Sequence, residues 1–455
     1  MWKVAHVIAV HKSSLRSKAE NYRQISILSC PGKVLDLLMS RRITAALGHV
    51  ISDKQHGFLQ GRSTTTNLVE YVSRLVTSIE EGHSVDALYL DFSRAFDCLD
   101  HDLLVRKLEK YGIGGGTSAW CSSYLARRKL QVRVGQELST PYEAISGVPQ
   151  SSHLGPILFL IYMQDLVARL SVDHSLYADD LKLSQKISSH ADALILQANL
   201  DLVAHWGALN SLHLNPTKCQ VITFSRRRSR NTVDTSYTLG ASQLARVSEV
   251  KDLGVYLDRK LDFRHHVDRV IARCRSTLGL VKRFAKEFND LTVTRTLYCS
   301  LVRPIAEYAS PVWAPYHATH IARLESVQKQ FVLFTLGRQA LPGSYALPPY
   351  KQRLSQLNLD RLSDRRKMAC VTLVHDLLMR RINCEELRGK VVVNSNRRGR
   401  QSRYLYETFH RTEYGRHEPL NKCVIIFNEV ADIFKRGLSR YAFRREVCSH
   451  FRSSD

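Results

Sequence analysis

Two short apolar runs that end in aspartates constrain this chain more than any other feature. Residues Ala87–Leu90 predict a buried strand, and Asp91 follows that strand directly. The run His174–Leu183 predicts two strands around a tight turn that contains Asp179 and Asp180. Carboxylates at a strand end and in a hairpin turn can converge from distant parts of a chain. The sequence therefore predicts a shared acidic site on a sheet.

The rest of the pattern predicts an α+β fold, because strands and helices alternate in the first half and helices dominate after about Asp262. We expect a catalytic body over residues 1–260, a helical region over 261–341 and a basic helical region over 342–455, with Pro342–Pro349 at the last boundary. The individual predictions are a helix from Ala95 to Leu108, a strand at Leu130–Val134, a buried helix at Leu154–Leu170, an amphipathic helix at Ala191–Leu212, and a strand pair at Tyr237–Leu239 and Leu253–Leu257.

The charge of the chain indicates a polyanionic partner. The 66 Lys and Arg residues outnumber the 42 Asp and Glu residues, which gives a formal charge of 66 − 42 = +24. Such an excess is typical of proteins that bind nucleic acid, although basic residues also simply solvate surfaces. The clusters Arg226–Arg228 and Arg397–Arg400 predict exposed loops.

Several classes of protein are disfavoured. The longest apolar runs, such as Ile157–Tyr162, are far shorter than the ~18 residues of a membrane-spanning helix, so we expect no membrane partner. The ten cysteines include no CxxC pair, which argues against zinc ribbons and a disulfide scaffold. His265 and His266 resemble metal ligands, but adjacent helical residues diverge, and we expect a solvated face.

The three aspartates suit hard divalent ions. Mg²⁺ prefers carboxylates, water and substrate phosphate, and two such ions can activate a hydroxyl and hold a leaving pyrophosphate. The alternative is ordinary turn chemistry, because Asp is common in hairpin turns.

The order of the motifs favours the catalytic interpretation. Residues Asp91–Asp97, Ser146–Gln150 with Leu154–Pro156, and Tyr177–Asp180 occur in sequence. Together they resemble motifs A, B and C of reverse transcriptases, specifically those of LINE-type (non-LTR) retrotransposons. Further segments resemble the fingers motifs, motifs D and E and the helical segment after the polymerase core: Asn21–Ser26, Gln55–Phe58, Gly61–Thr64, Leu214–Lys218, Leu253–Val255, Leu301–Pro304 and Tyr308–Trp313.

The resemblance implies a right-hand polymerase, with fingers and an antiparallel palm sheet, followed by a thumb-like helical region. It implies that Asp91, Asp179 and Asp180 bind two Mg²⁺ ions, for which Mn²⁺ can substitute, and that Lys218 protonates the leaving pyrophosphate. Phe96 would lie under the incoming sugar and exclude a 2′-OH; its alternative is a core phenylalanine. The residues expected to bind substrate are Phe92, Phe96, Arg62, Arg23, Gly147, Pro149, Gln150 and Tyr177. Solvated surface positions remain the alternative for the arginines and for Lys218.

One departure from the family pattern bears on activity. Motif B usually continues as Pro-Gln-Gly-Ser, whereas Ser151 follows Gln150 here. A Cβ and a hydroxyl where the backbone approaches the nucleotide would strain the loop or slow incorporation.

The resemblance implies an RNA-directed DNA polymerase that copies an RNA template from a DNA primer with dNTPs. The alternatives are a degenerate remnant that only binds nucleic acid, and a metal-dependent nuclease. Elements of this kind place an endonuclease upstream, and the chain starts close to the first fingers motif, so we expect that function in trans. The resemblance also implies a cytoplasmic ribonucleoprotein and a nuclear site of action.

Overall fold

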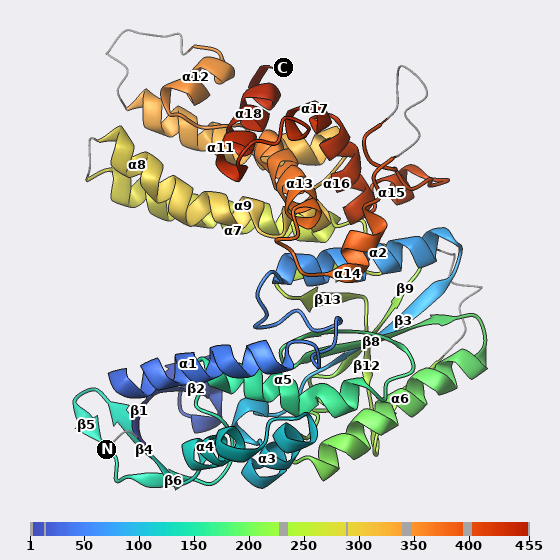
Figure 1. The fold of residues 1–455 in the computed structure, drawn as a ribbon. Coiled ribbons are helices and arrows are strands. Elements are labelled where there is room, and N and C mark those ends of the chain that lie inside the picture. Colours follow the sequence, from blue (N-terminus) through green and yellow to red (C-terminus); the bar gives the residue numbers. More distant parts are fainter. Residues whose placement is uncertain are drawn as a thin grey trace. The chain divides into compact units, whose positions relative to one another are not determined.

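The computed structural model describes residues 3–12, 15–226, 235–287, 290–338, 348–394 and 403–453 (Figure 1). The chain divides into two compact units. The first comprises Met1–Leu59, Asp86–Val221 and Val233–Arg246, and the second comprises Gln60–Val85, Ile222–Thr232 and Val247–Asp455. Both predicted arginine clusters and the Pro342–Pro349 boundary lie wholly or partly outside the described residues.

A first sheet in the first unit has the strand order β2-β1-β4-β5, with β6 also paired to β4. Strand β1 runs antiparallel to β2 and parallel to β4, which confirms the strand predicted at Leu130–Val134. The strands are β1 (Val4–His11), β2 (Tyr22–Ile27), β4 (Arg128–Val134), β5 (Glu137–Leu138) and β6 (Tyr142–Ala144).

A second sheet carries the predicted acidic positions and has the order β12-β9-β3-β8-β7. Its strands are β3 (Ser84–Leu90), β7 (Asp173–Tyr177), β8 (Asp180–Ile187), β9 (Gln220–Phe224) and β12 (Ala245–Val247). Strands β7 and β8 form an antiparallel hairpin in which Tyr177 faces Asp180, so the predicted hairpin is confirmed. Strand β3 is buried almost throughout, as its continuous apolar run predicts.

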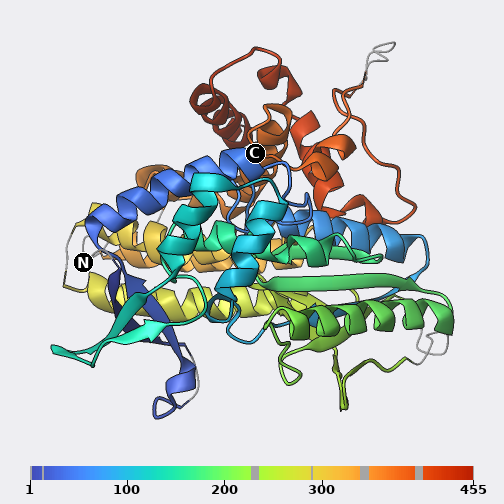
Figure 2. The same cartoon turned by 60° about the horizontal axis from the view of Figure 1, so that its bottom comes forward.

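The α-helices in the described residues of the first unit are α1 (Cys30–Leu47), α3 (His101–Lys110), α4 (Gly115–Leu125), α5 (Leu154–Val167) and α6 (His190–Leu209). Helix α5 is apolar all round, so it is buried in the core, where it packs against α1. Figure 2 shows α6, in green, alongside the β7–β8 hairpin. The carboxylate of Asp36 in α1 is fully buried and accepts the N–H of His153 at 2.5 Å, which holds the start of α5.

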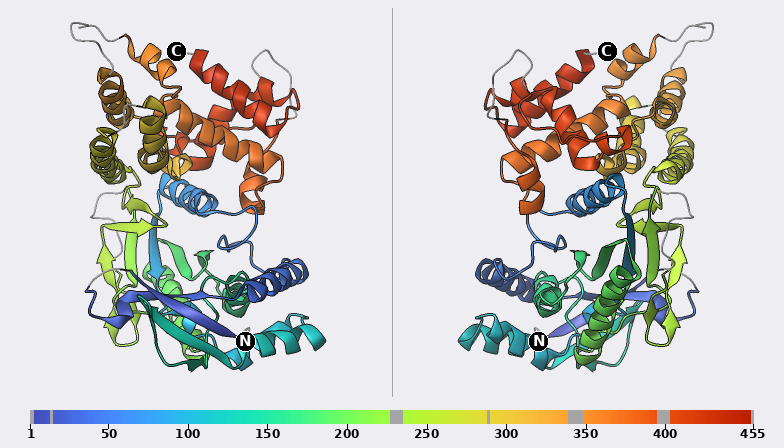
Figure 3. Two further views of the ribbon diagram at one scale, coloured as in Figure 1. Left: turned by 90° about the vertical axis from the view of Figure 1, so that its left-hand side faces the viewer. Right: turned by 90° about the vertical axis from the view of Figure 1, so that its right-hand side faces the viewer.

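The second unit is mainly helical. Its helices are α2 (Thr64–Glu80), α7 (Arg264–Ala285), α8 (Leu291–Leu297), α9 (Arg303–Glu307), α10 (Ser310–Trp313), α11 (Ala318–Gly337), α12 (Tyr350–Gln356), α13 (Leu362–Leu378), α14 (Glu385–Lys390), α15 (Glu413–Arg416), α16 (Pro419–Asn428), α17 (Ala431–Phe434) and α18 (Arg440–Ser453). Helices α7 and α11 pack together, and α13 packs against α16 and α18 (Figure 3).

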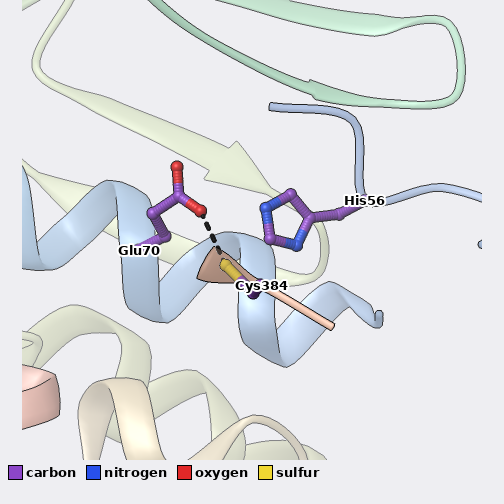
Figure 4. Close-up of side chains that lie close together, drawn as sticks. All are labelled: His56, Glu70 and Cys384. Atoms are coloured by element: carbon purple, nitrogen blue, oxygen red, sulfur yellow. Dashed lines mark hydrogen bonds between the residues drawn. The ribbon is translucent and has the colours of Figure 1, made fainter. Parts of the chain in front are cut away.

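Helix α2 joins this unit through both apolar and polar contacts. It packs against α10 and α16. At its own N-terminus, the side chains of Ser63 and Thr66 form a capping box. The thiol of Cys384 donates to the buried carboxylate of Glu70 at 3.2 Å (Figure 4). Burial raises the pKa of Cys384 to about 12, so the thiol keeps its proton and remains a donor.

Two local predictions are wrong. The predicted helix from Ala95 to Leu108 is a 3₁₀ turn at Ala95–Asp97 followed by α3, because Asp100 caps a new helix by accepting the N–H of Leu103 at 2.7 Å. The two predicted strands near residues 238 and 255 exist but do not pair with each other. Each forms a short local hairpin instead: β10 (Thr238–Leu239) with β11 (Ser242–Gln243), and β13 (Glu249–Asp252) with β14 (Val255–Asp258).

Helix α2 belongs to the second unit, together with the later helices. No helix in the described part of the chain is both long and apolar enough to cross a bilayer.

Candidate active site

Asp91 lies immediately after β3, where the segment that contains motif D crosses it. The carbonyl oxygen of Asp91 accepts the N–H of Asn215 at 2.8 Å, and Phe92 forms an antiparallel bridge with Leu214. The ammonium group of Lys218 lies 3.1 Å from Asp91 Oδ2. The side chain of Asp91 is 36% exposed, so it is accessible from solvent.

Asp179 lies in the two-residue turn between β7 and β8, Asp180 is the first residue of β8, and β8 is the neighbour of β3 in the sheet. Burial raises the pKa of Asp179, and the negative charge of Asp91 raises it further, although the Asp179 backbone N–H, Arg23 and Lys12 act in the opposite direction. The carboxylates of Asp91 and Asp179 therefore repel each other electrostatically.

This set of side chains fits hard divalent ions. Carboxylate oxygens are the ligands that such ions prefer, and the mutual repulsion of Asp91 and Asp179 is what a bound cation would relieve. Asp91, Asp179 and Asp180 would hold the ions, as expected for a family that generally uses divalent metals.

The motif B loop is joined by backbone hydrogen bonds to motif A and to the residues just after it. The N–H groups of Gly147 and Val148 donate to the carbonyl oxygens of Leu99 and Phe96, each at 2.8 Å. Gly147 has φ of +80°, and a Cβ there would lie 2.6 Å from the carbonyl oxygen of Asp97. Only glycine fits this approach without moving the backbone.

Side chains strengthen the same connection. Nε2 of Gln150 donates to Asp97 Oδ1 at 2.8 Å, and the hydroxyl of Ser146 donates to the carbonyl oxygen of Asp97 at 2.9 Å. Burial raises the pKa of Asp97, whereas the hydrogen bond from Gln150 lowers it. The structure thus brings together the Gly147 and Gln150 positions and motif A, with Pro149 buried beside them.

The two motif A phenylalanines lie in different environments. The ring of Phe96 stacks on Phe159 with centroids 4.6 Å apart, meets Phe58 edge-on at 6.1 Å, and remains partly exposed. The side chain of Phe92 is only 4% exposed and belongs to the core. The Phe92 ring therefore packs in the core and is not accessible to a substrate.

The expected phosphate-binding arginines also differ. Arg23 is exposed on β2, and its charge acts on both Asp179 and Asp97. Arg62 lies in the second unit, where its Nε donates to the carbonyl oxygen of Asn383 at 2.6 Å. Tyr177 is a partly exposed residue at the end of β7.

Sequence reasoning missed two contributors to this site. Lys12 is exposed at the end of the β1 segment and its charge acts on Asp179, but a lone lysine after a strand gives no distinguishing signal. Gln55 is buried, and its side chain accepts a hydrogen bond from the N–H of Ala178, next to Asp179. The sequence marks Gln55 only as part of a fingers motif.

The expectation for His266 is wrong, since it is 3% exposed rather than solvated. Its Nδ1 accepts the N–H of Tyr256 at 3.2 Å, and its ring meets Trp313 edge-on at 4.8 Å. Burial lowers the pKa of His266 to about 4. His266 belongs to α7, which packs against α11, α9 and β14.

Ser151 has φ of +81°, in the left-handed region that favours glycine, and its hydroxyl donates to the carbonyl oxygen of Ser26 at 2.5 Å. We expect Ser151→Gly to increase the rate of primer extension several-fold, because it removes a strain of roughly 1–2 kcal/mol and a Cβ from this loop. Loss of the Ser26 bond and a more flexible unfolded chain offset that gain, so the thermal midpoint should change little.

Ser151→Ala is the matched control. It keeps the Cβ and the strained φ but removes the hydroxyl, so it should lower the thermal midpoint without increasing extension. An equal gain in rate from Ser151→Ala would show that the hydroxyl, rather than the backbone conformation, limits the loop.

The sequence matches a model of the family described as reverse transcriptase (RNA-dependent DNA polymerase) over residues 10–257. It is 27% identical over 349 residues to a probable RNA-directed DNA polymerase from transposon BS of Drosophila melanogaster, covering 72% of this chain and 38% of the relative. It is 26% identical over 341 residues to the RNA-directed DNA polymerase from mobile element jockey of the same species, covering 72% and 37%.

The chain thus spans less than two fifths of the length of these relatives. Among solved structures, apo telomerase from Candida tropicalis is similar with a TM-score of 0.45 and 8% identity, over 80% of this chain and 63% of that chain. The family match covers more than half of the sequence and includes all three predicted aspartates, and the relatives come from transposons. The chain therefore belongs to the reverse transcriptase family, and its resemblance to non-LTR retrotransposon enzymes is confirmed.

Proposed function

We propose that this chain is an RNA-directed DNA polymerase that adds dNTPs to the 3′-OH of a DNA primer on an RNA template. The observation that supports the proposal is that β3, which ends at the residue before Asp91, is the sheet neighbour of β8, which begins directly after Asp179. Under this proposal, the three aspartates would hold two Mg²⁺ ions, or Mn²⁺ in their place, which would supply positive charge for the primer hydroxyl and the leaving pyrophosphate.

The protein's own groups take the remaining roles. Asp91, Asp179 and Asp180 hold the ions, and Arg23 attracts triphosphate oxygens with its exposed guanidinium. Lys218 is exposed and its ammonium group lies 3.1 Å from Asp91, which supports a role for it as the acid that protonates the leaving pyrophosphate. The net charge of +24 supports binding to the backbones of both nucleic acids.

A primer-extension assay tests the proposal. The full chain is incubated with primed RNA template and dNTPs, with Mg²⁺ or Mn²⁺ and with EDTA as the control. We expect extension that requires the divalent ion. Binding of the template without extension under either ion would favour the nucleic-acid-binding alternative, and template cutting without dNTPs would favour the nuclease alternative.

We expect Phe96→Val to reduce the preference for dNTPs over rNTPs by roughly 10–100-fold, because a smaller side chain leaves room for a 2′-OH. The measurement is kcat/KM for matched dNTP and rNTP pairs. Phe92→Val is the control, since Phe92 is a core residue: it should lower stability and leave sugar selection unchanged. Relaxed selection in Phe92→Val but not in Phe96→Val would refute the assignment.

We also propose, from the family resemblance, that the chain assembles with RNA in the cytoplasm and acts in the nucleus. A tagged full chain that remained cytoplasmic and free of RNA would contradict this.

A further inference from the structure

A short segment before α2 runs beside the strand that leads to the paired aspartates. Gln55 and Leu176 form a parallel bridge, separate from the named strands of the sheet. The N–H of His56 donates to the carbonyl oxygen of Leu176 at 3.0 Å, and the N–H of Leu176 donates to that of Lys54 at 3.0 Å. These two bonds fix the register between the segment and β7.

That register directs the side chain of Gln55 at the main chain of Ala178. Oε1 of Gln55 accepts the N–H of Ala178 at 2.9 Å, and Nε2 donates to the carbonyl oxygen of Ala178 at 3.2 Å. Oε1 also accepts the N–H of Gly57 at 2.7 Å. Gln55 is 3% exposed, so water does not replace these bonds.

Ala178 is the residue immediately before Asp179, and its backbone needs support. Its φ is +59°, a conformation that residues with a Cβ rarely adopt. The side-chain amide of Gln55 satisfies both polar groups of this residue, which favours the unusual conformation over an extended one. A carboxylate or an apolar side chain of similar length could not both accept and donate here.

Gly57 allows the segment to approach Ala178 closely because it has no side chain. A Cβ at Gly57 would lie 2.4 Å from the nitrogen and 3.0 Å from the Cα of Ala178. Any other residue would displace the turn or the segment, so Gln55 and Gly57 are both required for this close approach.

We propose that Gln55, with Gly57 beside it, is a positioning residue that holds the turn bearing Asp179 and Asp180 in its metal-binding conformation; this rests on the proposed polymerase function. Gln55 itself touches neither ions nor substrate. Its effect passes through Ala178 to the direction in which the two carboxylates project.

Gln55→Met tests the proposal, because it preserves the length of the side chain and removes all three bonds. Hydrogen–deuterium exchange of peptides that span Tyr177–Asp180 should become about tenfold faster or more. In primer extension, the divalent-ion concentration for half-maximal rate should rise about tenfold and kcat should fall, whereas KM for template–primer should not change. Gly57→Ala should reproduce both effects by displacing the same backbone.

Gln197 provides a matched control. Its side-chain amide accepts the N–H of Thr238 at 2.9 Å and donates to the carbonyl oxygen of Thr238 at 2.8 Å, the same two-point bond at an exposed site. Gln197→Met should accelerate exchange near Thr238 and leave extension and its ion dependence unchanged.

The two possible failures are distinguishable. If the wild-type chain does not extend primers but Gln55→Met still accelerates exchange at the turn, the polymerase proposal fails and the structural role of Gln55 stands. If the wild-type chain extends primers and Gln55→Met matches it in exchange and ion dependence, the positioning role is refuted. A thermal midpoint within a few degrees of wild type shows that the variant is folded.

Discussion

Asp179→Asn should reduce primer extension about 10³-fold or more and, at the same time, make the metal-free protein more stable. The loss of activity follows because the neutral amide of Asn binds a hard divalent ion much more weakly than the charged carboxylate does. The gain in stability follows because Asp179 is desolvated and repelled by Asp91, which raises its pKa. Stability and activity therefore oppose each other at this residue.

The sign of the stability change follows from proton binding. Because the pKa of Asp179 is higher in the folded chain than its ordinary value of 3.8, the folded state binds the proton more tightly than the unfolded state. The free energy of unfolding thus falls as pH rises through the window between the two pKa values. At neutral pH the charged side chain costs stability, and the uncharged Asn avoids this cost.

We expect the thermal midpoint of Asp179→Asn in EDTA to exceed that of wild type by roughly 2–4 °C, the shift that about 1 kcal/mol produces in a domain of this size. Adding Mg²⁺ or Mn²⁺ should stabilise wild type more than the variant, because ligands that bind the folded state raise its stability. Asp173→Asn, at the exposed far end of the same hairpin, is the control and should preserve extension. A lower midpoint in Asp179→Asn would contradict the repulsion between the carboxylates.

Gly147→Ala should both destabilise the first unit, by about 3 kcal/mol or more, and reduce extension at least 10²-fold. The new Cβ would lie 2.6 Å from the carbonyl oxygen and 2.7 Å from the Cα of Asp97, and φ at this position is +80°. The loop cannot move away without losing the bonds from Gly147 to Leu99 and from Val148 to Phe96. Thermal unfolding and the extension assay measure the two effects.

Gly135→Ala separates the contact from the backbone strain. Gly135 also has a left-handed φ, +63°, but a Cβ there would meet nothing within 4 Å. It should cost about 1 kcal/mol and leave extension unchanged. If both variants behaved alike, strain alone would explain Gly147, and the approach of the motif B loop to motif A would have no functional weight.

Local pattern was sufficient for the elements whose burial shows in their own residues. Strand β3 and helix α5 are continuous apolar runs, and the β7–β8 hairpin has strand-forming residues on either side of a turn. The single helix predicted from Ala95 to Leu108 is wrong because Asp100 is a capping residue. It starts α3 after the Ala95–Asp97 turn.

Partner choice could not be predicted in this way. The sequence of α2 indicates which face of the helix is apolar. It does not indicate that α2 packs against α10 and α16, which follow more than 200 residues later. The strands β10 and β14 were each predicted, yet each pairs with an immediate neighbour rather than with the other. His266 is buried for the same reason, since its partner Trp313 lies far along the chain.

By itself, the sequence determined the class of the fold, the aspartates at the end of β3 and in the hairpin turn, and the family, because apolar runs, turn residues and motif order are properties of short segments. Only the tertiary structure decided how those segments support one another: the buried amide of Gln55 against Ala178, and the contact of Gly147 with Asp97. These contacts join residues 50 to more than 100 positions apart, and hydrogen bonds such as those of 2.9 and 3.2 Å between Gln55 and Ala178 depend on the packing of the whole unit rather than on any local pattern.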